Sequence, residues 1–134
     1  MTIKFPAPVP EIPVNDIDKA LSYYRDCLGF NIDWGRGSSL AGISRDEARI
    51  FLADADFRAS NGNHAPNLIW VNLNSKEEVD QLYERWSQNG ALVVSPPESK
   101  PWNLHEFIVK DLDENIIRVF YDFNWELSEE DKRT

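Results

Sequence analysis

The sequence predicts an α+β fold built from two βαβββ modules. Each half of the chain opens with a strand-like run, continues with a helix of 3.6-residue periodicity, and closes with three short apolar runs typical of strands. The two helices start at Asp16 and Ser75 and stop at Gly29 and Gly90, so starts and stops are offset by nearly the same number of residues. Such duplication indicates two like modules that share a core or a cleft.

The first module is expected to span about residues 5–55. Residues 9–14 alternate like a strand, and Asp16 or the Asn before it can cap the helix that follows. Gly29 ends this helix, because glycine readily adopts the left-handed conformation of a helix C-terminus. Residues 30–34, 39–44 and 48–54 then show the pattern of three strands. The apolar residues of the helix share one face: Ile17, Leu21, Tyr24 and Leu28.

The second module is expected to span about residues 67–123. After a strand at 67–73, Ser75 and Glu78 have the spacing of a capping box and open a helix. Strands are predicted at 91–95, 104–110 and 115–120. The polar, Asn-rich residues 56–66 are interpreted as a linker, either a plain connection or a flap over a site. The charged residues 124–134 lack periodicity and are expected to form a solvated tail of this single domain.

Composition excludes several classes of protein. The net charge of −9 and the lack of a basic stripe argue against nucleic-acid binding, and favour cationic ligands or simple solubility. The chain has no run of about 18 apolar residues and no export-signal pattern, so we expect a cytoplasmic protein without a membrane partner. The one cysteine, Cys27, cannot form an internal disulfide, and its helical context favours a buried or half-buried thiol over a nucleophile.

Two stretches carry a resemblance to a known family: "VNDIDKALSYYRDCLGF" at 14–30 and "PWNLHEFIVKDLDENIIRVF" at 101–120. They resemble the glyoxalase, bleomycin-resistance and extradiol-dioxygenase superfamily, also called vicinal oxygen chelate proteins, and nearly the whole chain is covered. The second stretch is similar to the Pro-Trp-Gly-x-Arg-Glu-Phe and Asp-Pro-Asp-Gly-Asn motifs of the bleomycin-resistance branch. Its matching residues are Pro101, Trp102, Glu106, Phe107, Asp111, Asp113 and Asn115. Its departures are Asn103, His105, Leu112 and Glu114.

One of these departures bears on a turn. Glu114 stands where the family motif has glycine, and glutamate is poorly suited to a left-handed backbone conformation. We therefore expect the neighbouring Asn115 to take the left-handed position of this turn, since asparagine tolerates that conformation.

The resemblance implies a cup-shaped mixed sheet with helices on its convex side, ligands in its concave side, and a homodimer. In enzymatic relatives the cup holds a divalent metal through residues on its first, fourth, fifth and eighth strands. Here the first, fifth and eighth positions fall on Val9, Leu68 and Arg118, and the fourth strand has no carboxylate. Because catalytic metals need about three N, O or S ligands, we expect no metal, no cofactor and no family-type catalysis.

Alternation along the strands predicts which side chains line the concave side. Arg118 has two interpretations: it contacts the ligand, or it neutralises Glu11 or Glu106 inside the sheet. The tryptophans also have two interpretations: they line a ligand pocket, or they belong to the core, as a Trp in a small domain often does. The predicted ligand-binding residues are Glu11, Trp34, Phe51, Trp70, Asn72, Trp102, Glu106, Arg118 and Phe120.

These features favour a metal-free homodimeric binding protein that sequesters an aromatic or cationic, antibiotic-like small molecule in a dimer cleft. A second hypothesis is a glyoxalase-like or dioxygenase-like metalloenzyme with displaced ligands drawn from His105, Glu106 and Glu11. A third is a metal-free lyase or isomerase with Glu11 or Glu106 as general base, which requires a raised carboxylate pKa.

Overall fold

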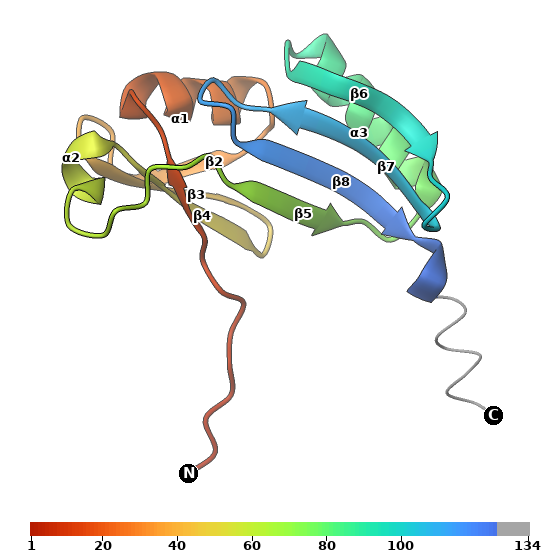
Figure 1. Cartoon of the computed structure of the whole chain (residues 1–134), viewed down its shortest axis with the longest axis horizontal. Helices are drawn as coiled ribbons and strands as arrows, with labels where there is room; N and C mark the ends of the chain where they lie inside the picture. The colour runs from red at the N-terminus through yellow and green to blue at the C-terminus, as the bar shows by residue number, and fades with distance from the viewer. Residues whose placement is uncertain (126–134) are drawn as a thin grey trace. The chain divides into compact units, whose positions relative to one another are not determined.

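The computed structural model describes residues 1–125, so most of the tail expected at 124–134 lies outside the described residues (Figure 1). The chain divides into two compact units. Unit one comprises Met1–Asn67 together with Asp111–Asn115, and unit two comprises Leu68–Lys110 and the chain from Ile116 onward. Each unit holds one four-stranded mixed sheet and at least one helix, which confirms the α+β class. The cup remains a prediction.

Unit one contains the first strand-helix-strand pattern of the sequence. Its elements are β1 (Glu11–Pro13), α1 (Ile17–Asp26), β2 (Asn31–Trp34), β3 (Leu40–Arg45), β4 (Ala48–Ala53) and a short α2 (Ala55–Arg58). In its sheet, ordered β1-β4-β3-β2, β1 runs parallel to β4 and the other pairs are antiparallel.

Helix α1 forms where the sequence predicts it. Asp16 is its N-cap, and its Oδ1 accepts the Lys19 backbone N–H at 3.0 Å. Gly29, with φ of 74°, turns the chain away after the helix. The helix buries Leu21 and Tyr24 completely, and Leu28 after it is also fully buried, so the apolar face identified in the sequence forms the core of unit one.

The segment interpreted as a linker is tied to unit one. Helix α2 begins at Ala55 and ends in this segment, and the side chain of its last residue, Arg58, is only 6% exposed. Its guanidinium donates to the backbone oxygens of Ala53, Val14 and Asn63 at 3.0, 3.3 and 3.0 Å. Because a buried guanidinium must find acceptors, these bonds fix the segment against β1 and the end of β4.

Unit two repeats the pattern with β5 (Leu68–Asn72), α3 (Lys76–Gln88), β6 (Leu92–Ser99), β7 (Leu104–Lys110) and β8 (Ile116–Asp122). In its sheet, ordered β5-β8-β7-β6, β5 runs parallel to β8. Ser75 caps α3 by accepting the Glu78 backbone N–H at 3.1 Å, as the capping box predicts. Helix α3 lies across one face of this sheet (Figure 1). Its Trp86 ring packs edge-on against Phe107 of the sheet.

The turn Asp111–Asn115 corrects one expectation. Glu114, with φ of 67°, takes the left-handed position that Asn115 was expected to occupy. Asn115 is 1% exposed, and its side chain donates to the Pro13 backbone oxygen and to Asp111 at 2.9 and 2.8 Å. The Asn115 amide therefore serves as a buried connector, and the exposed Glu114 adopts the less favourable backbone conformation.

No helix within residues 1–125 is long and apolar enough to cross a membrane.

Candidate functional site

One face of the unit two sheet carries most of the predicted ligand-binding residues. Trp70 lies opposite Arg118 in the β5-β8 register, and Asn72 lies opposite Phe120. The alternate residues Ile117 and Val119 are buried on the other face. The alternation read from the sequence therefore describes β5 and β8 correctly.

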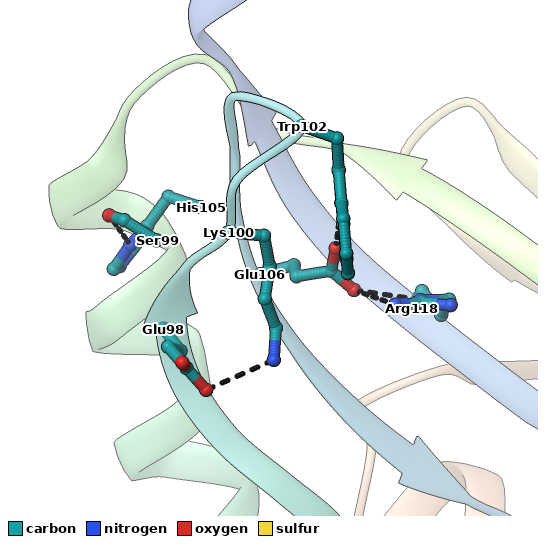
Figure 2. A network of polar contacts seen from close by, with 7 residues as sticks. All are labelled: Glu98, Ser99, Lys100, Trp102, His105, Glu106 and Arg118. Atoms are coloured by element: carbon teal, nitrogen blue, oxygen red, sulfur yellow. Dashed lines mark hydrogen bonds and ion pairs between the residues drawn. The ribbon is translucent and has the colours of Figure 1, made fainter.

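Five side chains on this face form a connected group, here called the tryptophan cluster: Trp70, Trp102, Glu106, Arg118 and Phe120. The Arg118 guanidinium lies over the Trp70 ring, 4.5 Å from its centroid, and the Phe120 ring meets Trp70 edge-on at 5.4 Å. Arg118 donates through Nε to Glu106 Oε2 at 2.7 Å and through Nη2 to the same oxygen. Trp102 Nε1 donates to Glu106 Oε1 at 2.8 Å, so Trp102 and Arg118 reach this carboxylate from two sides (Figure 2).

Glu106 is the buried centre of the cluster. Its side chain is completely inaccessible, whereas the Arg118 side chain is 22% exposed. A buried carboxylate is tolerated only when it is paired and hydrogen-bonded, and here both oxygens have donors. Of the two acids weighed as partners for Arg118, the structure shows the ion pair with Glu106. Glu11 lies in unit one and accepts hydrogen bonds from the side chains of Asn61 and Asn63.

The two indoles of the cluster are held in place yet half exposed. Trp70 is 46% exposed and Trp102 is 50% exposed, so neither belongs to the core. Lys100 is a further residue beside the cluster that the sequence did not predict: its ammonium lies 5.9 Å from the Trp102 ring centroid and pairs with Glu98 at 3.0 Å. A Lys beside a Pro-Trp turn gave a weak signal, because nothing in its spacing shows which ring it meets.

The predicted residues of unit one form a separate row. Glu11 lies opposite Phe51, Phe51 opposite Gly42, and Gly42 opposite Trp34, so one line crosses all four strands. The Trp34 and Phe51 rings meet edge-on at 5.1 Å. A Cβ on Gly42 would come within 2.6 Å of the indole, so glycine is what lets the ring lie there. An isolated glycine inside a strand pattern is the sequence signal for such a close approach.

His105 and Glu106 do not share a face. The His105 ring nitrogens contact Ser99 Oγ at 2.9 Å and, on α3, Asp80 Oδ1 at 2.8 Å. Glu106, the next residue of β7, points to the opposite side (Figure 2). A displaced metal site that combines these two side chains is therefore wrong for this sheet.

The remaining histidine and the cysteine are also poorly placed to bind a metal or to act as a nucleophile. Within residues 1–125, no group of three or more His, Cys, Asp or Glu side chains is placed to hold a metal ion. His64 Nδ1 contacts the Arg58 guanidinium at 3.0 Å. Burial, and next the charge of Asp26, raise the pKa of the Cys27 thiol, which disfavours the thiolate needed of a nucleophile.

This half-exposed aromatic face belongs to a chain whose family is shown by its sequence. Residues 7–119 match the Glyoxalase/Bleomycin resistance protein/Dioxygenase superfamily, and the chain belongs to it. It is 29% identical over 124 residues to a bleomycin resistance protein of Geobacillus stearothermophilus, covering 84% of this chain and 93% of that one. It is 25% identical over 116 residues to the uncharacterized protein YraH of Bacillus subtilis, covering 80% and 91%.

Solved structures with this fold include binding proteins and enzymes. The bleomycin-binding protein of Streptomyces verticillus, solved with copper(II)-bleomycin, has a TM-score of 0.68, 23% identity, and coverage of 88% of this chain and 97% of that one. A lactoylglutathione lyase of Agrobacterium tumefaciens has a TM-score of 0.71, 19% identity, and coverage of 89% and 96%. These likenesses establish the fold, and function must be argued from the side chains of this chain.

Proposed function

We propose that the protein is a metal-free binding protein that sequesters an aromatic, antibiotic-like small molecule. The observation that carries the proposal is the tryptophan cluster, in which two half-exposed indoles stand on one sheet face. Aromatic rings present large contact areas, and stacking on such a ring contributes about 0.5–1.5 kcal/mol beyond burial of area.

The cluster is organised before any ligand arrives. Trp102 is oriented by its bond to Glu106, and Trp70 is flanked by Arg118 and Phe120. Side chains that are already ordered lose little conformational entropy on binding, so more of the contact energy appears as affinity. Asn72, which is exposed beside Phe120 on this face, supplies a polar group for orienting a ligand.

The relatives support capture of a drug-like molecule, since the chain resembles proteins named for bleomycin resistance. The net charge of −9 favours ligands that also carry cationic groups. The proposal further includes a cytoplasmic homodimer that binds its ligand in a dimer cleft. Glu11, Trp34 and Phe51 of unit one remain predicted ligand-binding residues in this proposal. The half-exposed Trp34, Trp70 and Trp102 supply apolar surface that a ligand or partner subunit can cover.

Calorimetric titration with metal-free bleomycin tests the proposal in the intact protein and in Trp70→Ala and Trp102→Ala variants. Each variant is expected to lose about tenfold in affinity, which corresponds to about 1.4 kcal/mol, because each removes one stacking surface. Leu112→Ala is the matched control, since Leu112 is an equally exposed apolar side chain in the Asp111–Asn115 turn. Equal affinity in all four proteins, with unchanged circular dichroism, would contradict a binding role for the cluster.

A further inference from the structure

We infer that the tryptophan cluster selects flat aromatic groups bearing an anionic substituent over cationic ones. This inference rests on the proposed function and names the chemistry that the cluster recognises. It applies to the part of a ligand that reaches the cluster; the acidic surface elsewhere remains available to cationic parts of the same ligand.

The carboxylate of the cluster is already satisfied. Glu106 has no accessible side-chain surface, and both of its oxygens accept hydrogen bonds from Trp102 or Arg118. A ligand cation would have to displace the Arg118 guanidinium to reach it. Glu106 therefore cannot serve as the counter-ion of a cationic ligand.

Each of the two indole rings is already in contact with a cation of the protein itself. The Arg118 guanidinium lies over Trp70, and the Lys100 ammonium lies 5.9 Å from the Trp102 ring centroid. The attraction of a ring quadrupole for positive charge is thus already used at both tryptophans. A second cation on either ring would meet like-charge repulsion at close range, whereas an anionic or electron-rich ring would be attracted.

Arg118 also has donor capacity left for a ligand. Its Nε and Nη2 serve Glu106, while Nη1 has no acceptor among residues 1–125. With 22% of the side chain exposed, Nη1 can donate to a ligand sulfonate or carboxylate beside the Trp70 ring. Glu98, an exposed acid, pairs with Lys100, so the two cations and the two acids balance in number. Because Glu106 is inaccessible, the charge that a ligand meets beside the Trp70 ring is that of Arg118.

Three naphthalene probes of similar shape test this selectivity: naphthalene-2-sulfonate, naphthalene-2-methanol and naphthalene-2-methylammonium. Titrations followed by tryptophan fluorescence at about 0.15 M salt keep the long-range field of the acidic protein screened. The expected order of affinity is sulfonate, then methanol, then methylammonium. If methylammonium binds tightest, the charge selectivity is overturned while aromatic binding stands. If no probe quenches the tryptophans, the proposed function fails together with the inference.

Two variants sharpen the test. Glu106→Gln keeps an oxygen for Trp102 but leaves the Arg118 charge uncompensated, so sulfonate affinity is expected to rise about tenfold. Glu47→Gln, in the exposed turn between β3 and β4, changes the net charge equally and is expected to leave sulfonate affinity within about twofold. Lys100→Gln disturbs no buried group and should weaken sulfonate severalfold relative to methanol. Equal sulfonate affinity in Lys100→Gln and the unmodified protein overturns the inference even if Glu106→Gln does not fold.

Discussion

Arg118→Met is the substitution that most directly probes how the tryptophan cluster is held together. It retains an apolar side chain of similar length but removes the charge that compensates Glu106, whose carboxylate has no accessible surface. Removing one partner of a buried ion pair costs about 3–5 kcal/mol. Because 22% of the Arg118 side chain is exposed, water can partly reach the vacated site, so we expect the lower end, about 3 kcal/mol.

Equilibrium urea unfolding measures this loss, and the midpoint should fall by about 1.5 M for an m-value near 2 kcal/mol/M. The double variant Arg118→Met with Glu106→Gln carries neither charge and keeps an acceptor for Trp102, so it should lose only about 1 kcal/mol. If the single Arg118→Met variant is no less stable than the double variant, Arg118 does not compensate a buried charge on Glu106.

Substitutions at three positions of unit one give further predictions, which are measured by urea unfolding and, for Gly42, also by tryptophan emission. Tyr24→Phe removes the hydroxyl that donates to Asp111 at 2.8 Å and should cost about 1–3 kcal/mol. Burial, then Asp111, raise the pKa of Tyr24 well above its ordinary 10.0. The unmodified protein should therefore lose stability above about pH 10, and Tyr24→Phe should lose less. Parallel curves of stability against pH for the two proteins in this range would contradict the prediction. Burial raises the pKa of Asp113, so its charged form is disfavoured in the folded state. Asp113→Asn should therefore slightly raise the urea midpoint at pH 7, and this gain should vanish below about pH 3.8, where the carboxyl is protonated in both states. A gain that grows in acid would contradict the prediction. Gly42→Ala should displace the Trp34 ring, shift its emission and cost about 1 kcal/mol; unchanged emission would mean that the strand shifts instead.

The elements could be predicted from local patterns because their ends are written in the sequence. Asp16 and Ser75 cap α1 and α3, and Gly29 and Gly90 have positive φ after them. The extent of β6 could not be predicted in this way, because Pro96 and Pro97 suggested that the strand ends at residue 95. β6 continues to residue 99 as an edge strand with irregular register, where missing N–H donors are tolerated.

The sequence predicted which side chains of the candidate site share a sheet face, but not which of them contact one another. Alternation placed Trp70 and Arg118 on one face of β5 and β8, because a strand has only two faces. Whether Arg118 would meet Glu106 or Glu11 depended on side-chain reach between strands, which spacing does not encode. The left-handed Glu114 was missed for a similar reason, since the demand on Asn115 comes from a buried amide site formed by distant residues.

Metal-free sequestration is tested by metal analysis of the protein purified without chelator, paired with calorimetric titration of metal-free bleomycin into the same sample. A sequestering protein should contain substoichiometric metal and bind one or two ligands per dimer. Stoichiometric zinc, nickel, manganese or iron without ligand binding would contradict it and direct attention to a metalloenzyme.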